Sequence, residues 1–334
     1  MNMEDELVGC NEYDRLECGD CLGCDRQDQC NGQSHPSGLD QCSGHDHSIE
    51  EIVKEYHASR EPQCNLFENP VFYELFDGIV RPGGLKLTQQ AMELCNFDKG
   101  AKILDIGCGY GATVEFLQSK YGVDATGIDL STTMLERGKE RNPKLSLQFG
   151  DAEMLDFPSL SFDCVFMECV LSLTENVVEA LHEAYCVLKN GGKLIISDFY
   201  RKEPGKISQT PIRCQGSCSH AHTDGHGDHA HHAHEHEHKE QGSAGDPPKI
   251  KTCLDGAFDA EELKSTLFEI GFQVLSWEDR SKELKEFTAT LIMHFGSLDA
   301  FYKSVMQDGN GDSFFSGIDN HKKLGYFLMV AEKK

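Results

Sequence analysis

The sequence has little positive charge and no long apolar run. Only 31 of its 334 residues are Lys or Arg, against 56 Asp or Glu, which gives a formal net charge of -25. Such an acidic surface repels phosphate backbones, so we expect no nucleic-acid partner. No apolar run approaches the roughly 18–20 residues that span a bilayer, so we expect no membrane partner either. The first residues lack the basic and apolar regions of a signal peptide, which favours a cytoplasmic location.

Cysteine, in contrast, is abundant, with 15 residues in the chain. An odd number in a reducing compartment argues against a disulfide framework. Metal binding, thiol chemistry and simple burial in a core remain as explanations. Nothing in the composition indicates an oligomeric state.

Composition divides the chain into four parts. Residues 1–62 are acidic, rich in cysteine and poor in apolar residues. Residues 63–200 alternate apolar strands with amphipathic helices, and residues 201–250 form a low-complexity stretch of His, Gly and Ser. A regular pattern then returns from 251 to 334. We expect 63–200 and 251–334 to build one fold, with 201–250 as an insert.

The regular parts alternate strand-like and helix-like patterns. Strands are predicted at 102–106, 124–129, 145–150, 162–167, 193–198, 272–277 and 323–333. This alternation predicts an α/β fold, with a Rossmann-like, mostly parallel sheet of about seven strands and helices on both faces. We expect the last strand to run antiparallel, as a hairpin with the sixth.

Three helices are expected between these strands, and a fourth follows the insert. The first spans 112–120, and the second runs from an N-cap at Ser131 to about residue 141. The third presents an apolar face from Val177 to Leu188 and is expected to end at Gly191 and Gly192. The fourth begins with a capping box that is formed by Asp259 and Glu262.

A glycine-rich turn, GCGYG, follows the first strand and precedes the first helix. Gly107, Gly109 and Gly111 let the backbone turn sharply, and they let a ligand approach the main chain. The amino end of the helix offers free N–H groups and a partial positive charge. The same pattern also fits the dinucleotide fingerprint, so the turn alone leaves the class of nucleotide open.

Carboxylates at three successive strand ends narrow that choice. Asp105 lies two residues before the first glycine, where it can bind an amino group but would repel the pyrophosphate of a nicotinamide cofactor. Asp129 can hold the hydroxyl groups of a ribose. Asp151 and Ala152 follow the third strand, where a side chain and a backbone N–H can hold an adenine.

The segments ILDIGCGYG, GIDLS, GDAEML, FDCVFMECVLSL and LKNGGKLIISD, in that order, resemble the motif series of class I S-adenosylmethionine-dependent methyltransferases. The resemblance covers residues 75–200, with a looser tail to 334. It implies a class I methyltransferase fold, S-adenosyl-L-methionine as cosubstrate and a small-molecule acceptor. The cofactor-binding residues that it implies are Asp105, Gly107, Cys108, Gly109, Gly111, Asp129, Leu130, Asp151 and Ala152.

The segments ECVLSL, GGKLIISDFY and CLDGAF are similar to a narrower group, the arsenite methyltransferases. That group has one cysteine after strand four and another before a Gly-Ala pair, and these positions here are Cys169 and Cys253. The resemblance implies that two thiolates hold a soft, thiophilic centre such as trivalent arsenic. The lone pair of arsenic can then attack the methyl group without a base.

Three departures from that group keep other acceptors open. Glu168 stands where the group has asparagine, residues 112–113 replace its Arg-Asp pair, and its N-terminal thiol has no clear match beyond Cys64 or Cys95. In the alternative interpretation the acceptor is another small molecule, and Glu168 acts as a base or binds a cationic group. Cys169 then only lines the pocket as a small buried residue. The candidate catalytic residues are therefore Cys169, Cys253 and Glu168.

Two segments outside the regular parts have the composition of metal sites. Four closely spaced thiols suffice for zinc or an iron–sulfur cluster, and nine histidines in 214–238 suit zinc, nickel or copper. The candidate ligands are Cys18, Cys21, Cys24, Cys30, His229, His231, His234 and His236. A redox-sensitive tail and an incidental loop expansion are the alternatives. These segments support a second hypothesis, a metal-binding accessory or sensor protein that is built on a methyltransferase scaffold.

Overall fold

The computed structural model describes residues 66–203, 212–213, 249–250, 252–254, 256–306 and 323–334. The chain divides into two units, Met1–Glu61 and Pro62–Lys334, and everything below concerns the second. The acidic N-terminal part and most of the His-rich insert lie outside the described residues. The four-part division that the sequence suggests therefore stays a prediction.

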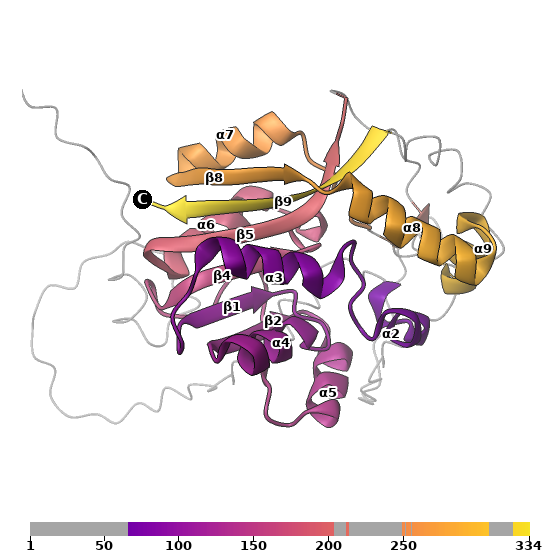
Figure 1. The fold of residues 1–334 in the computed structure, drawn as a ribbon, viewed down its shortest axis with the longest axis horizontal. Helices are drawn as coiled ribbons and strands as arrows, with labels where there is room; N and C mark the ends of the chain where they lie inside the picture. The colour runs from indigo at the N-terminus through magenta and orange to yellow at the C-terminus, as the bar shows by residue number, and fades with distance from the viewer. Residues whose placement is uncertain (1–65, 204–211, 214–248, 251, 255, 307–322) are drawn as a thin grey trace, which may run out of the picture. The chain divides into compact units, whose positions relative to one another are not determined.

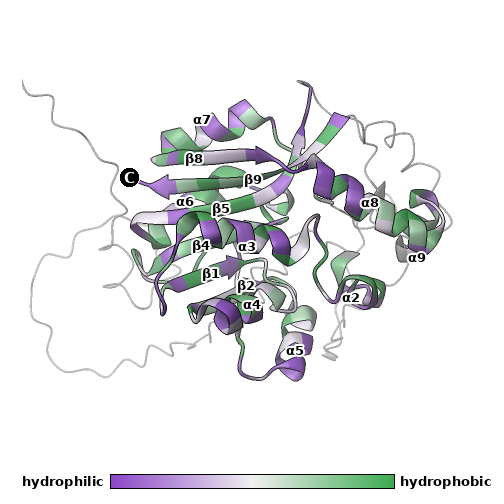
Figure 2. Ribbon diagram, in the orientation of Figure 1, coloured by the Kyte–Doolittle hydropathy of each residue, from purple (hydrophilic) through white to green (hydrophobic). Residues whose placement is uncertain are grey.

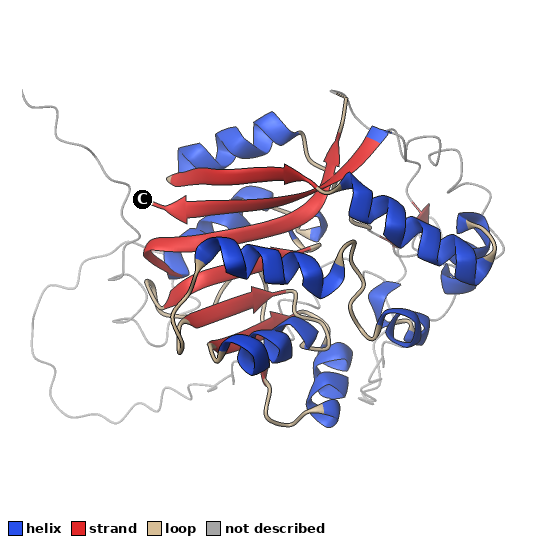
Figure 3. Ribbon diagram, in the orientation of Figure 1, coloured by secondary structure: helices blue, strands red, loops and turns tan. Residues whose placement is uncertain are grey.

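Seven of the described strands form one sheet, in the order β3-β2-β1-β4-β5-β9-β8 (Figure 3). They are β1 (Lys102–Ile106), β2 (Asp124–Asp129), β3 (Ser146–Phe149), β4 (Phe162–Glu168), β5 (Leu188–Arg201), β8 (Phe272–Asp279) and β9 (Leu324–Lys333). Pairing is parallel from β3 to β5, while β9 runs antiparallel to both of its neighbours. This is the predicted Rossmann-like sheet. A separate two-stranded pair joins β6 (Ile212–Arg213) and β7 (Lys249–Ile250).

Helices cover both faces of the sheet (Figure 1). They are η1 (Leu66–Glu68), α2 (Pro70–Phe76), α3 (Gly84–Cys95), α4 (Ala112–Tyr121), α5 (Thr132–Arg141), η2 (Leu171–Leu173), α6 (Val177–Val187), α7 (Ala260–Ile270), α8 (Ser281–Phe295) and α9 (Leu298–Met306). Buried residues of α6 and α7 pack on one face, and those of α3, α4 and α5 pack on the other. No described helix combines the length and the apolar character that crossing a membrane requires.

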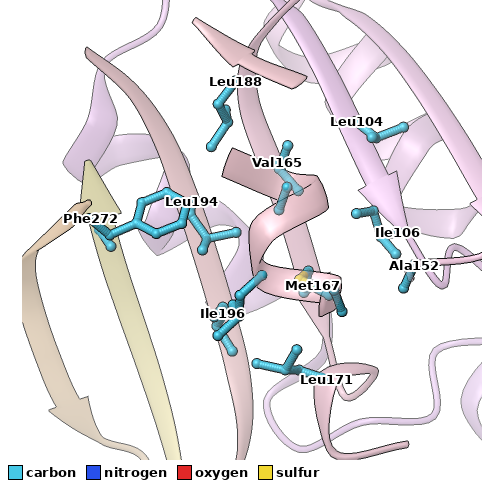
Figure 4. Packing of buried hydrophobic residues seen from close by; sticks show 14 of the residues in the cluster. Leu104, Ile106, Ala152, Val165, Met167, Leu171, Leu188, Leu194, Ile196 and Phe272 are labelled. Atoms are coloured by element: carbon cyan, nitrogen blue, oxygen red, sulfur yellow. The ribbon is translucent and has the colours of Figure 1, made fainter. Parts of the chain in front are cut away.

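The core lies on both sides of β4 and β5, whose side chains alternate between the two faces. Val165 and Met167 belong to the cluster under α6 and α7, whereas Cys164 and Phe166 belong to the cluster under α3 and α4. Figure 4 shows the first of these clusters, and Figure 2 shows the apolar residues concentrated along the central strands. A sheet that is buried on both faces explains why its central strands are almost continuously apolar.

The structure corrects two details of the predicted elements. The helix α6 ends at Val187, and Leu188 already opens β5, so Gly191 lies inside the strand region and does not end the helix. The ammonium group of Lys333 donates to the carbonyls of Tyr185 and Leu188 at 2.7 and 2.8 Å, which satisfies carbonyls at the end of this helix. The pairing of β8 with β9 is antiparallel as expected, but α8 and α9 separate these strands in the chain, so they form no hairpin.

Candidate active site

The glycine turn joins β1 to α4 and depends on left-handed backbone angles. Gly107, Gly109 and Gly111 have φ values of 71°, 53° and 74°. A Cβ atom on Gly107 would lie 2.1 Å from Cγ2 of Val170, in the segment that follows β4. Glycine is therefore required here by backbone angle and by close packing, irrespective of any ligand. At the amino end of α4, no side chain forms a capping hydrogen bond.

Asp105 lies in the second-last position of β1 and is 3% exposed. Among the described residues, its Oδ2 atom has no hydrogen-bond partner. Burial raises the pKa of this carboxyl well above its usual range, Glu168 raises it further, and the positive charge of Arg81 opposes the rise. A buried carboxylate oxygen without a donor suits a ligand that brings its own donor or positive charge.

Asp129 is the last residue of β2, and its side chain is hydrogen-bonded to the glycine turn. Its Oδ2 accepts the N–H of Gly109 and its Oδ1 accepts the N–H of Ser131, both at 2.8 Å. Burial raises the pKa of Asp129, while these amide bonds lower it. Each carboxylate oxygen has a second lone pair, so hydroxyl groups of a ligand can still be accepted.

The remaining predicted cofactor residues are spread between surface and core. Leu130, next to Asp129, is 46% exposed, whereas Ala152 is buried. Asp151 is buried too, and its Oδ1 accepts the N–H of Glu153 at 2.9 Å. Cys108 packs so closely on β2 that a Cβ at residue 127 would lie 2.7 Å from its sulfur. Burial raises the pKa of the Cys108 thiol well above its usual range, as for a core residue.

Glu168, the last residue of β4, belongs to a buried charged cluster. Its Oε2 lies 2.7 Å from Nη2 of Arg81. The hydroxyl of Thr88 donates to Oε1 at 2.8 Å, and that of Thr113 donates to Oε2 at 3.1 Å. Nη2 of Arg81 also donates to both hydroxyls. Glu168 therefore already has a cationic partner, which no sequence pattern indicated.

The next residue, Cys169, has an unusual backbone for a non-glycine, with φ of 59°. Its amide donates to the carbonyl of Ser197 at 2.8 Å, and its sulfur lies 3.1 Å from the hydroxyl oxygen of Tyr326. The thiol of Cys253 donates to the carbonyl of Cys169 at 3.5 Å. The structure thus brings together the two cysteines that the sequence singled out, 84 positions apart.

A third group joins these thiols. The sulfurs of Cys169 and Cys253 and a carboxylate oxygen of Asp198 all lie within 4.8 Å of one another, and all three residues are buried. Burial raises the pKa of the Cys169 thiol well above its usual range, and Cys253 and Asp198 raise it further. Asp198 ends the IISD segment that the sequence predicts as the fifth strand, but in the structure it lies inside β5, which continues to Arg201. The sequence indicated it only as part of a motif.

Cys253 reaches this place because the chain beside it packs very closely on η2. A Cβ on Gly256 would lie 1.9 Å from the carbonyl oxygen of Ser172, so only glycine allows this approach. Phe258 then pairs with β5 through its N–H to the carbonyl of Phe199. Close packing on η2 therefore explains why glycine is found in the Gly-Ala pair after Cys253.

The other predicted sites have different outcomes. Cys95 has Cys164 and Lys193 as its electrostatic neighbours, in the first half of β4 and β5, and so does not supply a third thiol to Cys169 and Cys253. Cys64 lies outside the described residues. So do the predicted metal ligands Cys18, Cys21, Cys24, Cys30, His229, His231, His234 and His236.

Segments before β1 and after β8 close over this edge of the sheet. Tyr73 of α2 packs edge-on against Tyr110 of the glycine turn, and Glu68 accepts a hydrogen bond from the hydroxyl of Ser131 at 2.6 Å. Phe76 stacks on Phe287 of α8, with ring centres 4.7 Å apart. Figure 1 shows α2, α8 and α9 gathered beyond the carboxyl end of β1.

Residues 104–196 match the family described as "Methyltransferase domain". Phosphoethanolamine N-methyltransferase 1 of Zea mays is 34% identical over 137 residues, which cover 40% of this chain and 27% of the relative. Phosphoethanolamine N-methyltransferase 1 of Arabidopsis thaliana is 33% identical over 149 residues, which cover 43% of this chain and 30% of the relative. The chain carries a class I S-adenosylmethionine-dependent methyltransferase domain. It spans less than a third of the length of these two relatives.

Solved structures agree with this methyltransferase domain at the level of the fold. Phosphoethanolamine N-methyltransferase 2 of Haemonchus contortus, in complex with S-adenosyl-L-methionine, has a TM-score of 0.53 and 18% identity over 80% of this chain and 56% of that one. The [4+2]-cyclase SpnF has a TM-score of 0.52 and 21% identity, and the match covers 82% of this chain and 98% of SpnF. One fold thus hosts a methyltransferase and a cyclase, so the fold alone does not identify the reaction.

Proposed function

We propose that this protein transfers a methyl group from S-adenosyl-L-methionine to a small-molecule acceptor. The observation that carries the proposal is the buried Oδ2 of Asp105, which lacks a hydrogen-bond partner among the described residues and lies beside the glycine turn. An α-ammonium group supplies both the missing donors and a positive charge. A nicotinamide dinucleotide would bring its negative pyrophosphate to the same place.

The residues around Asp105 fit the rest of this cosubstrate. The uncapped amino end of α4 suits its carboxylate, because N–H groups and the helix dipole favour an anion there. The free lone pairs of Asp129 suit the ribose hydroxyls. The exposed side chain of Leu130 offers an apolar surface for the adenine, beside the turn that holds Asp151 and Ala152.

The chemistry that the cosubstrate supplies is a methyl group activated by a sulfonium. The protein then mainly has to place a nucleophile in line behind that methyl group. Glu168 is held by Arg81 and two threonine hydroxyls, so it is poorly suited to take a proton from the acceptor. This favours an acceptor whose lone pair needs no deprotonation.

A thiophilic acceptor such as arsenite meets that requirement, and we propose Cys169 and Cys253 as its ligands. Arsenous acid loses two hydroxyl groups as water when two thiols form bonds to arsenic, and the thiol protons leave with them. The arsenic lone pair then attacks the methyl carbon, and the breaking carbon–sulfur bond leaves its electron pair on S-adenosylhomocysteine. The sulfonium delivers the methyl group without its bonding electrons, so the arsenic lone pair forms the new bond and arsenic is formally oxidised from +3 to +5. The cosubstrate itself is the oxidant, and no other is needed. The proximity of the two buried sulfurs supports this assignment.

An amine acceptor is the second candidate, because an open pocket between the α2–α3 connection and α8 has the right chemistry. It measures about 350 Å³ and is lined by Arg81, Phe76, Phe287, Glu283 and Glu286, among others. Aromatic faces and carboxylates suit a cationic amine. An ammonium group has to lose a proton before its nitrogen can attack the methyl group, and a pocket carboxylate such as that of Glu286 is the proposed proton acceptor. The names of the plant relatives, which describe phosphoethanolamine as acceptor, point in the same direction.

The test is a panel of arsenite, antimonite, small thiols, phosphoethanolamine and dimethylglycine, scored by release of S-adenosylhomocysteine. Cys169→Ser and Cys253→Ser should each abolish arsenite-dependent release, while Cys186→Ser, a half-buried cysteine of α6, should leave it unchanged. Phe287→Ala should raise KM only if the amine is the acceptor. Calorimetry with S-adenosyl-L-methionine comes first, because binding weaker than millimolar would favour the accessory-protein hypothesis instead.

A further inference from the structure

The cluster of Cys169, Asp198 and Cys253 contains one group that the proposed methyl transfer does not use, the carboxylate of Asp198. Its Oδ1 accepts hydrogen bonds from the hydroxyl of Ser172 and the N–H of Phe199, at 2.7 and 2.8 Å. Its Oδ2 accepts the N–H of Ser172 at 2.9 Å. These bonds hold the carboxylate in place beside the thiols. They use both lone pairs of Oδ1 but only one of Oδ2, so Oδ2 can still accept a further partner.

We propose that Cys169, Cys253 and Asp198 form a binding site for a thiophilic divalent cation such as Zn²⁺ or Cd²⁺. Two sulfurs and one oxygen are ligands that borderline and soft cations accept, whereas Mg²⁺ and Ca²⁺ prefer oxygen alone. A tetrahedral zinc ion with bonds of ~2.3 Å to sulfur needs sulfurs about 3.8 Å apart. The three ligand atoms lie within 4.8 Å of one another, so a movement of at most about 1 Å brings the sulfurs to this spacing. The three residues then fill three of the four tetrahedral positions.

The backbone prepares these ligands before a cation arrives. Cys169 is held with φ of 59° by the hydrogen bond from its amide to the carbonyl of Ser197, a conformation that is unfavourable for a non-glycine residue. The hydroxyl of Tyr326 contacts the Cys169 sulfur and donates to the side chain of Ser197. The surrounding wall is apolar, with Leu87, Phe199 and Leu324 in the same cluster. Such surroundings exclude competing water and strengthen the bonds to a cation.

A cation that occupies both thiols removes them from a thiophilic acceptor, so it should inhibit arsenite-dependent turnover. Only this inhibition rests on the proposed function; binding of the cation does not. The two can therefore fail separately. Turnover without a cation site at Cys169 would leave the proposed function intact, and a cation site without turnover would leave this inference intact.

The test is ¹¹³Cd NMR of the full-length chain with Cd²⁺ in excess over all thiols and imidazoles, because the cadmium shift reports the number of sulfur ligands. One resonance should have the shift of a two-sulfur site, vanish in Cys169→Ser and Cys253→Ser, and move in Asp198→Asn. Cys164→Ser is the matched control, a fully buried cysteine of β4 outside the cluster, and it should keep the resonance. Spectra that are identical in all five proteins would overturn the proposal.

A second measurement needs no variant and so is insensitive to misfolding. Stoichiometric Cd²⁺ should slow alkylation of Cys169 and Cys253 by iodoacetamide relative to Cys186, as mapped by mass spectrometry of the peptides. Equal rates with and without Cd²⁺ at Cys169 and Cys253 would also overturn the proposal.

Discussion

Replacing Arg81 with methionine should destabilise the domain more than any loss of a surface ion pair. Arg81 and Glu168 are 11% and 3% exposed in their side chains, and their charged atoms lie 2.7 Å apart. Removing one partner of such a buried pair leaves the other charge without compensation, which typically costs about 3–5 kcal/mol. The hydroxyls of Thr88 and Thr113 still donate to the carboxylate. We therefore expect a loss at the lower end, about 3 kcal/mol.

The assay is urea unfolding of the variants at pH 7, as a double-mutant cycle. Glu168→Gln in the Arg81→Met background removes the uncompensated charge, so the double variant should recover about 1–2 kcal/mol. Lys189→Met is the matched control, because its pair with Asp163 is exposed at 43% and 33% and should be worth less than about 1 kcal/mol. The reasoning is refuted if Arg81→Met costs no more than Lys189→Met, or if the two losses in the cycle simply add.

Three further predictions concern the glycine turn, the cosubstrate and the Cys253 segment. Gly107→Ala should lower the free energy of unfolding by at least about 3 kcal/mol, because its Cβ would lie 2.1 Å from a carbon of Val170. Gly191→Ala is the control, since Gly191 has a similar φ but open space around it, and it should cost about 1 kcal/mol. The affinity of the wild-type protein for S-adenosyl-L-methionine should fall as pH decreases through the raised pKa of Asp105, since only the ionised carboxylate attracts the ammonium group. The Asp105→Asn variant should bind S-adenosyl-L-methionine more weakly, with an affinity that does not change over the same pH range. Gly256→Ala should abolish arsenite-dependent turnover while calorimetric binding of S-adenosyl-L-methionine stays within about twofold, because the clash displaces only the segment after the insert.

A different result would contradict each of these three predictions. Equal losses in the two glycine variants would mean that contact with Val170 does not matter. A wild-type affinity that rises at low pH would show that Asp105 does not face the ammonium group. The stability of the protein should change with pH in the opposite direction to its affinity for S-adenosyl-L-methionine. Ionising a buried carboxyl of raised pKa destabilises the fold, so the wild-type protein should lose stability relative to Asp105→Asn as pH rises. A Gly256→Ala protein with normal arsenite turnover would separate Cys253 from acceptor binding.

Local patterns predicted the parallel part of the fold well, for physical reasons. The run KILDI is mostly apolar because both faces of its sheet are covered, and the segments KILDI and DATGID match β1 and β2 residue for residue. Ser131 and Asp259 cap helices with their side chains, as their positions suggested. These signals act over a few residues, so they can be read without knowing the tertiary contacts.

The sequence was less informative where distant segments meet. The end of α6 was misplaced because the carbonyls at that end bond to Lys333, almost 150 positions away. The helices α2, α3 and α8 were not anticipated, although α2 and α8 close the edge of the sheet where the site lies. Arg81 carried no signal at all, since its role depends on Glu168, 87 positions further along the chain.

The amino-acid sequence by itself determined the type of sheet, the glycine turn and the strand-end carboxylates, because strand periodicity, left-handed turns and helix caps are properties of neighbouring residues. It also singled out Cys169 and Cys253 by resemblance, without showing that they meet. Only the tertiary structure decided that their sulfurs converge on Asp198 and that Arg81 takes the charge of Glu168. Those distances depend on how the strand ends and the segment after the insert pack together, and that packing is a property of the whole domain.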